Sequence, residues 1–314
     1  MISFWEKESL LHYDIIVVGA GIVGLQTAIQ IKKRKPQWNV LVLERGLLPS
    51  GASTRNAGFA ATGSLSELVS DVAHSSHEEI YKLFSQRKQG LDFLRRQLGD
   101  AAIGYTPEGS YELLYPSEAG VLEHIDFFNK LLGALNPKGP IFTIQTEKIK
   151  TFGFNSTNFA YCVSNATEAG LHTGKLLNSM TELATSEKIA IRTGAEVVAI
   201  EEEGQSVCVQ VKDPARGSTL TFSAAQVVIC TNAFAKRFFP EADVQPGRGQ
   251  VLITTPMERV PFKGIFHFEQ GYYYFRNVGN RVLLGGGRNR DFEGESTTEL
   301  ALHDEIQKHL VHIL

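Results

Sequence analysis

The feature that most limits the fold of this chain lies near its beginning. Residues 14–18, DIIVV, are mostly β-branched and predict a strand that is buried on both faces of a parallel sheet. A GAGIVG turn follows at residues 19–24, and residues 25–33 carry apolar side chains at helical spacing. Residues 39–44, NVLVLE, predict the next buried strand and complete a βαβ unit of about 30 residues. This order of elements predicts a dinucleotide-binding domain.

The glycines of the turn have separate predicted roles. Gly19 permits the tight turn, Gly21 lets a pyrophosphate approach the helix N-terminus, and Gly24 lets helix and strand pack closely. A glycine turn alone also occurs for purely conformational reasons, so the prediction depends on the acid that ends the second strand. That acid stands about 20 residues after the turn, where a carboxylate binds ribose hydroxyls. The predicted contacts are Gly19, Gly21, Ile22, Val23, Gly24 and Glu44.

A loop of small residues after this acid distinguishes between two dinucleotides. An NAD-binding domain would normally continue into another strand and helix, whereas residues 50–63 are rich in Gly, Ala, Ser and Thr. Such a loop brings backbone amides against a flat, extended ligand that continues beyond the pyrophosphate. The loop therefore predicts FAD as the cofactor. The further predicted contacts are Arg45, Ser53, Thr54, Arg55, Asn56, Ala57 and Gly58, with Arg55 and Asn56 expected to anchor the loop and the flavin ring.

Composition excludes several other classes of protein. The net charge of −3 and the lack of a basic stripe argue against nucleic acid as a partner. The longest apolar stretch is too short for an integral membrane segment, which needs about 20 residues. Three cysteines without CxxC spacing and the absence of a secretory signal favour a cytoplasmic location. His74 and His77 stand three apart on a predicted helix, but no third ligand accompanies them, so no metal site is predicted.

The remaining patterns predict the fold class. Residues 67–99 predict one helix, and residues 172–187 predict another. Residues 189–213 and 218–233 predict strands joined by a hairpin in an antiparallel appendage, and aromatic-rich strands fill the last third. The predicted class is α/β (α+β overall). It combines a Rossmann-like FAD-binding domain with a parallel sheet and an antiparallel-sheet substrate domain with flanking helices.

Several segments together resemble the D-amino-acid oxidase-like superfamily of FAD-dependent oxidoreductases, which includes glycine oxidase, sarcosine oxidase and γ-glutamylputrescine oxidase. IIVVGAGIVGL with VLVLERG is similar to the family's opening, and GASTRNAG resembles its flavin-contacting loop. GAEVVAIEEEG resembles the strand that contacts adenine, which implies that role for Val197. VVICTNAFA resembles the segment usually written ATGAW, which implies cofactor contacts at Thr231, Asn232 and Ala233. Asn232 replaces a glycine there, and asparagine tolerates the positive φ that this turn requires.

The resemblance also implies a chemistry. Family members remove a hydride from the carbon that bears an amine and deliver it to FAD, and the imine product is hydrolysed. A neutral amine loses hydride without a dedicated base, so the lack of a catalytic triad is expected. The implied partners are a small amine or amino acid and an electron acceptor, either oxygen or a quinone. The sequence leaves open whether the protein forms a homo-oligomer.

QPGRGQVLITTP resembles the family's xxRGQ strand, and GYYYFRNVGNRVLLGGG resembles the aromatic strand and hairpin that cover the flavin. These two segments supply the catalytic candidates. By motif position Tyr272 corresponds to a substrate-contacting tyrosine, with core packing as its alternative. Arg248 is a candidate contact of flavin or substrate, with a surface ion pair as its alternative. Arg276 and Arg288 are candidates for binding a carboxylate through two hydrogen bonds, with solvation as their alternative.

Two further functions of the same fold stay open. One is an FAD-dependent 2-hydroxy-acid dehydrogenase, and the other is a flavin-binding protein without turnover. The predicted domains are a discontinuous FAD-binding domain at 1–65 and 155–245 and a substrate domain at 66–154 and 246–300. Residues 301–314 are expected to form a helix. The family's C-terminal flavin-contacting segment, with its D-x-x-P-x-x-G pattern, is expected to be absent.

Overall fold

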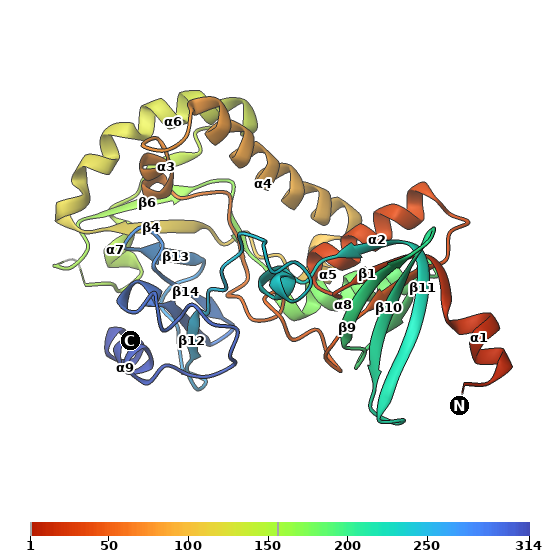
Figure 1. Ribbon diagram of the computed structural model, residues 1–314. Coiled ribbons are helices and arrows are strands. Elements are labelled where there is room, and N and C mark those ends of the chain that lie inside the picture. Colours follow the sequence, from red (N-terminus) through yellow and green to blue (C-terminus); the bar gives the residue numbers. More distant parts are fainter. Residues whose placement is uncertain (1, 156) are drawn as a thin grey trace. The chain divides into compact units, whose positions relative to one another are not determined.

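The computed structural model describes residues 2–155 and 157–314, and the chain divides into two compact units (Figure 1). Unit 1 comprises Met1–Asn56 and Thr173–Pro246, and unit 2 comprises Ala57–His172 and Gly247–Leu314. The predicted first domain also included residues 57–65 and 155–172. These segments belong to unit 2 because strand β3 (Phe59–Ala60) pairs with β7 (Ala169–Gly170), and β6 (Tyr161–Asn165) lies within the sheet of that unit.

Unit 1 contains a six-stranded sheet in the order β8-β2-β1-β11-β10-β9. The first four of these strands run parallel to one another, and β9 and β10 are antiparallel. The two helices α2 and α8 pack against each other beside the sheet. The elements are α1 (Phe4–Leu10), β1 (His12–Val18), α2 (Ile22–Arg34), β2 (Val40–Leu43), α8 (Thr173–Ser186), β8 (Ala190–Arg192), β9 (Val197–Glu203), β10 (Ser206–Asp213), β11 (Ser218–Ile229) and η3 (Asn232–Arg237).

Strands β1 and β2 confirm the prediction of strands that are buried on both faces. All four residues of β2 and the last four of β1 are buried. The expectation that β11 belongs to an antiparallel appendage is wrong for half of that strand. β11 is 12 residues long, so it pairs with β10 in antiparallel fashion and also runs parallel to β1 from Ser223 to Ile229. Its second half, with the run QVVI, therefore forms a central strand of the parallel sheet.

Unit 2 is built on a seven-stranded sheet in the order β12-β15-β14-β13-β4-β6-β5, in which only the β13–β4 pairing is parallel. Neighbouring residues of a strand point to opposite faces, and the two faces of this sheet have separate cores. Leu113 packs with α7 and α9, whereas Leu114 packs with α3, α4 and α6. The strands are β4 (Ser110–Leu114), β5 (Phe142–Ile144), β6, β12 (Gln250–Ile253), β13 (Ile265–Phe268), β14 (Tyr273–Val278) and β15 (Arg281–Gly286).

The single helix predicted for residues 67–99 is wrong, because residues 72–76 separate two helices. Ser76 accepts a hydrogen bond from the Glu79 backbone N–H and donates its own N–H to the Glu79 carboxylate, and this capping box starts the second helix. His74 consequently lies in the connecting turn. The helices of unit 2 are α3 (Leu65–Asp71), α4 (His77–Leu98), α5 (Asp100–Ile103), η1 (Pro116–His124), α6 (Ile125–Leu132), η2 (Gly133–Leu135), α7 (Lys148–Thr151), η4 (Arg288–Arg290) and α9 (Asp304–Ile313).

Candidate functional site

The glycine turn of unit 1 leaves no space for side chains. Gly19 has φ +107°, and a Cβ atom added there would lie 2.6 Å from the Cys230 carbonyl oxygen. A Cβ at Gly24 would collide with the Gly19 carbonyl oxygen. A Cβ at Gly21 would lie 2.9 Å from Ser53 Oγ. These contacts agree with the tight turn expected at Gly19 and the close packing expected at Gly24, since β1, the turn and α2 approach one another at backbone distance. The approach of a pyrophosphate at Gly21 stays a prediction.

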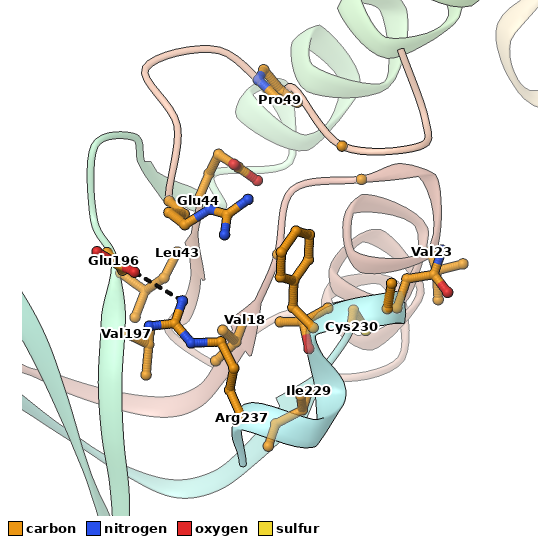
Figure 2. A pocket seen from close by; sticks show the side chains of 18 of the residues that line it. Val18, Val23, Leu43, Glu44, Pro49, Glu196, Val197, Ile229, Cys230 and Arg237 are labelled. Carbon is orange, nitrogen blue, oxygen red and sulfur yellow. Dashed lines mark hydrogen bonds and ion pairs between the residues drawn. The ribbon is translucent and has the colours of Figure 1, made fainter. Parts of the chain in front are cut away.

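A cavity of about 530 Å³ opens at the carboxyl ends of β1, β2 and β11 (Figure 2). This edge of a parallel sheet is where nucleotides bind in such folds, and the volume is in the range of small-ligand sites. Five of the predicted cofactor residues in unit 1 lie outside its lining, namely Ile22, Gly24, Thr54, Arg55 and Asn56, while Ala57 and Gly58 belong to unit 2. The cavity brings together Gly19, Gly21, Val23, Glu44, Arg45, Ser53, Val197, Thr231, Asn232 and Ala233.

Glu44 stands at the carboxyl end of β2 with both carboxylate oxygens bonded to backbone. Oε2 accepts from the Ala20 N–H at 3.0 Å, and Oε1 accepts from the Gly46 N–H at 2.9 Å. The carboxylate is therefore fixed beside the glycine turn, and each oxygen keeps acceptor capacity for a ribose hydroxyl. Arg45 stacks its guanidinium over the Phe234 ring at 4.2 Å from the ring centroid.

The turn after β11 has the conformation that the sequence suggested. Asn232 has φ +46°, which confirms the expectation that asparagine takes the positive φ of the glycine it replaces. The adjacent Thr231 leaves its Oγ1 atom buried and without a hydrogen-bond partner among the described residues. An unpartnered buried hydroxyl in the cavity lining, beside a turn that excludes side chains, fits a site that takes a polar dinucleotide.

Two charged residues that the sequence analysis did not predict, Glu196 and Arg237, line this cavity. Glu196 accepts from Arg237 at 2.8 Å and from Lys212 at 2.7 Å, and these hydrogen bonds from Lys212 and Arg237 lower the pKa of the Glu196 carboxyl. Figure 2 shows the first of these bonds across the lining. Glu196 directly precedes the predicted adenine contact Val197, and this adjacency is the one signal that would have pointed to it. No motif marks Arg237.

The loop after β2 is held by its own side chains. Ser53 Oγ accepts from the Ile22 N–H at 3.0 Å and so caps the start of α2. Thr54 Oγ1 donates to the Pro49 carbonyl at 2.7 Å, and Arg55 Nε donates to the Ser50 carbonyl at 2.7 Å. Asn56 Nδ2 donates to the Ala52 and Ser53 carbonyls. These contacts support the predicted anchoring of the loop by Arg55 and Asn56, and their contact with flavin stays a prediction.

In unit 2, the buried side chain of Arg276 holds the segment that continues this loop. Its Nη1 atom donates to the Gly58 carbonyl at 2.7 Å and to the Leu171 carbonyl at 2.9 Å. Burial lowers the pKa of Arg276, which has no counter-ion within hydrogen-bond distance in the described chain. Further along, the buried carboxylate of Glu168 accepts from the backbone N–H groups of Thr62 and Gly63. Arg276 thus makes structural contacts, and a catalytic role for it stays a prediction.

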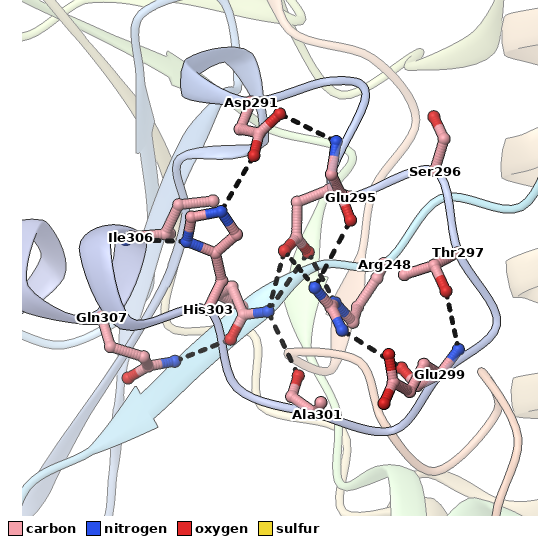
Figure 3. A network of polar contacts seen from close by, with 12 residues as sticks. Arg248, Asp291, Glu295, Ser296, Thr297, Glu299, Ala301, His303, Ile306 and Gln307 are labelled. Carbon is pink, nitrogen blue, oxygen red and sulfur yellow. Dashed lines mark hydrogen bonds and ion pairs between the residues drawn. The ribbon is translucent and has the colours of Figure 1, made fainter.

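Arg248 belongs to a buried polar network (Figure 3). Its Nε and Nη2 atoms donate to Glu295 at 3.0 and 2.7 Å, and the Glu295 side chain is fully buried. Burial opposes ionisation of Glu295, but hydrogen bonds from Arg248 and Gln250 keep its pKa below the usual value. At the edge of the network, His303 contacts Asp291 at 2.9 Å. The ion pair considered for Arg248 is therefore present, in the interior rather than on the surface, and contact with flavin or substrate stays a prediction.

The three consecutive tyrosines at β14 have different surroundings. Tyr273 is buried and stacks on Phe268, whereas Tyr274 contacts Phe59 and lies over Gly285. Tyr272 directly precedes the strand and is 41% exposed. Core packing is thus the role of Tyr273, and Tyr272 stays available as the predicted substrate contact.

Neither a membrane span nor a metal cluster is found among residues 2–155 and 157–314. Their helices are too short or too polar to cross a bilayer. No three of their His, Cys, Asp or Glu side chains lie close enough together to hold a metal ion. His77 instead places its ring 4.8 Å from that of Phe127.

The parallel sheet, the glycine turn and the acid of β2 define a dinucleotide-binding oxidoreductase fold. Residues 14–314 match the protein family described as FAD dependent oxidoreductase (DAO), over nearly the whole chain. The chain therefore belongs to this family, and FAD is its cofactor.

Two relatives and two solved structures illustrate the range of similar proteins. Sarcosine oxidase subunit beta from Arthrobacter sp. is 33% identical over 123 residues, which are 38% of this chain and 29% of that protein. Sarcosine oxidase subunit beta from Rhodobacter capsulatus is 33% identical over 96 residues, which are 29% of this chain and 22% of that protein. The matches thus span less than a third of either relative.

The structural similarity extends over most of the chain. Glycine oxidase from Geobacillus kaustophilus has a TM-score of 0.70 at 19% identity, covering 96% of this chain and 77% of its own. L-Proline dehydrogenase from P. horikoshii has a TM-score of 0.72 at 16% identity, covering 96% of this chain and 76% of its own. At these identities the comparison establishes the fold.

Proposed function

We propose that this protein oxidises the C–N bond of a small amine or amino acid. The observation that carries the proposal is the cavity of unit 1, in a chain that matches the FAD dependent oxidoreductase family from residue 14 to residue 314. Its relatives and structural neighbours include sarcosine oxidase, glycine oxidase and proline dehydrogenase, and these names all refer to secondary amines or amino acids.

The chain's own residues have binding and positioning roles in this proposal. Bound FAD would accept the hydride from the carbon next to nitrogen, and the imine product would hydrolyse in water. Gly19 and Gly21 admit the pyrophosphate to the N-terminus of α2, and Glu44 binds the ribose. Tyr272 contacts the substrate. Arg276 positions the Gly58 backbone, and Arg248 fixes β12 through Glu295.

An anaerobic screen of flavin reduction tests the proposal. The purified protein, loaded with FAD, is mixed with glycine, sarcosine, D-amino acids, L-proline, polyamine derivatives and 2-hydroxy acids, and bleaching of the flavin absorbance is followed. Reduction by amines or amino acids supports the proposal. Reduction by 2-hydroxy acids alone would support the dehydrogenase alternative, and reduction by none of them would indicate a flavin-binding protein without turnover.

The same FAD-loaded protein identifies the electron acceptor. We infer that either oxygen or a quinone takes the electrons, and mixing the reduced protein with each in turn gives the two reoxidation rates. Faster reoxidation by oxygen would assign an oxidase, and faster reoxidation by the quinone would assign a dehydrogenase.

A further inference from the structure

One face of the unit 2 sheet carries a row of titratable side chains. His267 on β13 is the register partner of Tyr274 on β14 and of Glu112 on β4. Register partners point to the same face of a sheet and are neighbours there. Leu114, two residues after Glu112, belongs to the core that packs with α3, α4 and α6, so the row lies on that face. Three side chains that can hold or pass a proton are thus neighbours on adjacent strands.

The carboxylate at one end of this row is buried without a cation. Glu112 is 3% exposed and accepts hydrogen bonds from the backbone N–H and the hydroxyl of Ser66. Among residues 2–155 and 157–314, this neutral serine alone donates to the carboxylate. A buried carboxylate is costly without a positive charge near it, so Glu112 provides a counter-ion for a cation that forms beside it.

The imidazole of His267 is buried and has no partner in the described part of the chain. The residue is 9% exposed, and its ring makes no hydrogen bond or ring contact with residues 2–155 or 157–314. Its nitrogens are nevertheless not enclosed by the protein, and neither is the Tyr274 hydroxyl. A buried histidine ordinarily uses a ring nitrogen in a hydrogen bond. The free ring of His267 therefore indicates a partner outside the described residues.

The other charged or titratable groups near this row are already bonded or neutral. Arg276, two residues beyond Tyr274, donates to backbone carbonyls. Burial raises the pKa of Tyr274, so its hydroxyl keeps its proton near neutral pH. Burial and, more weakly, the nearby charge of Glu112 raise the pKa of Glu118 in η1. His267 is therefore the member of the row that offers a free basic nitrogen.

The same face of the sheet carries the proposed substrate contact. The Gly287 N–H donates to the Tyr272 carbonyl at 3.0 Å, which continues the pairing of β14 and β15 to this tyrosine. Alternate residues of an extended segment share a face, so Tyr272 lies on the face of Tyr274 and His267. A substrate that touches Tyr272 is thus on the side of the sheet to which His267 points.

We propose that His267 accepts the proton of the substrate's ammonium group before oxidation. The inference rests on the proposed function. Hydride leaves the carbon beside a neutral amine, whereas an alkylamine with a pKa of about 10 is a cation at neutral pH. One N–H bond of the ammonium breaks and one N–H bond forms on the imidazole, with no change of oxidation state. Glu112 neutralises the imidazolium, and the proton passes to water after the product has left.

The pH dependence of flavin reduction tests the proposal in the FAD-loaded protein under anaerobic conditions. The substrate is the amine or amino acid that reduces the wild-type flavin fastest. At neutral pH, His267→Gln should slow reduction about 100-fold, since a positioned base contributes at least this much. Near pH 10, where a substantial fraction of the amine is neutral in solution, the variant should come within about fivefold of wild type.

The control is His74→Gln, at an exposed histidine of the same unit, which should match wild type at every pH. A purely structural role of His267 predicts a loss of the same size at every pH. That result, or no loss at any pH, would overturn the proposal.

A spectroscopic measurement separates this inference from the proposed function. α-Aminoisobutyrate has no hydrogen on the carbon beside its nitrogen, so it binds without being oxidised. In FAD-loaded protein with isotope-labelled histidine, the magnetic resonance signal that is lost in His267→Gln identifies the His267 ring. At a pH of about 8, saturation with α-aminoisobutyrate should move this signal from neutral imidazole to imidazolium.

The outcomes of the two experiments are distinct. A His267 ring that is charged before the amine is added, or that stays neutral afterwards, would overturn its role as proton acceptor. A wild-type flavin that no amine or amino acid reduces would overturn the proposed function, and the histidine spectrum would still decide whether His267 takes the proton.

Discussion

The two units build their candidate sites in opposite ways. In unit 1 the site depends on the absence of side chains, since Gly19 and Gly24 let backbone segments approach to distances that a Cβ atom would block. In unit 2 the contacts come from long charged side chains that bond to loops outside the sheet, such as Arg276 to the Gly58 carbonyl and Arg248 to Glu295. Backbone crowding suits a cofactor of fixed shape, whereas side-chain contacts can change without changing the fold.

The glycine turn of unit 1 is a feature that dinucleotide-binding proteins of this fold share. The side-chain contacts of unit 2 are particular to this chain. The charged side chains of unit 2 differ in whether the protein itself supplies their hydrogen-bond partners. Arg288 has no hydrogen-bond acceptor among the described residues, whereas Arg248 donates to Glu295 and Arg276 donates to the Gly58 carbonyl.

The largest expected effect is on the polar network of unit 2. Glu295→Ala removes the acceptor of Arg248 and leaves a buried charge unpaired, which should lower the free energy of unfolding by about 3–5 kcal/mol. Chemical denaturation followed by circular dichroism measures this change. Glu293→Ala, at an exposed carboxylate two residues away, is the matched control and should change the value by less than about 0.5 kcal/mol. Equal effects of the two substitutions would contradict a structural role for the network.

The glycine turn of unit 1 should respond through cofactor affinity. Gly24→Ala places a methyl group against the Gly19 carbonyl, and overpacking of this kind costs about 1–3 kcal/mol. FAD affinity should therefore fall about 10- to 100-fold, as measured by quenching of flavin fluorescence. Gly90→Ala in α4 of unit 2, where an added Cβ meets nothing within 4 Å, is the control and should bind FAD as wild type does. Unchanged affinity in Gly24→Ala would show that the turn does not hold the cofactor.

A smaller effect is expected at Asn232, whose φ is +46°. Asn232→Gly should retain FAD affinity, because glycine adopts this conformation freely. Asn232→Val should weaken FAD binding about 5- to 30-fold, since a left-handed conformation costs a residue with a Cβ about 1–2 kcal/mol. Equal affinities of the two variants would mean that backbone conformation at this turn does not matter for binding.

The smallest expected effect is the pH dependence of the His303–Asp291 contact. The hydrogen bond to Asp291 raises the pKa of His303, so its stabilisation is present below the ordinary histidine pKa of about 6.5 and is lost as pH rises through the raised value. His303→Asn should therefore lower Tm more at pH 5.5 than at pH 8.5. A difference from wild type that is the same at both pH values would exclude the ion pair as the cause.

The sequence predicted unit 1 well because its signals are local. Ala20 and Glu44 are joined across 24 positions by a strand, a turn and a helix that each have a recognisable pattern. The break before α4 was missed, although the Ser76 to Glu79 spacing of a capping box is visible in the sequence. Apolar residues at helical spacing lie on both sides of this break, so the pattern predicted one continuous helix.

The contacts of unit 2 could not be predicted, because their partners are distant in the chain. Arg276 and Gly58 are separated by 218 positions, and Arg248 and Glu295 by 47, with no motif that joins either pair. The same reason explains why Arg237 at the cavity of unit 1 was missed. An arginine's type indicates that it can bind a carboxylate, but only the folded chain shows whether an acceptor already occupies it.

The central claim is that the cavity of unit 1 binds the adenosine half of FAD. The most direct test is a titration of flavin-stripped protein with FAD and with FMN, which lacks adenosine monophosphate. We expect FAD to bind one to one and FMN to bind at least about 100-fold more weakly, because FMN makes no hydrogen bonds to Glu44 and buries no adenine against Val197. FMN binding as tight as FAD binding would contradict the claim.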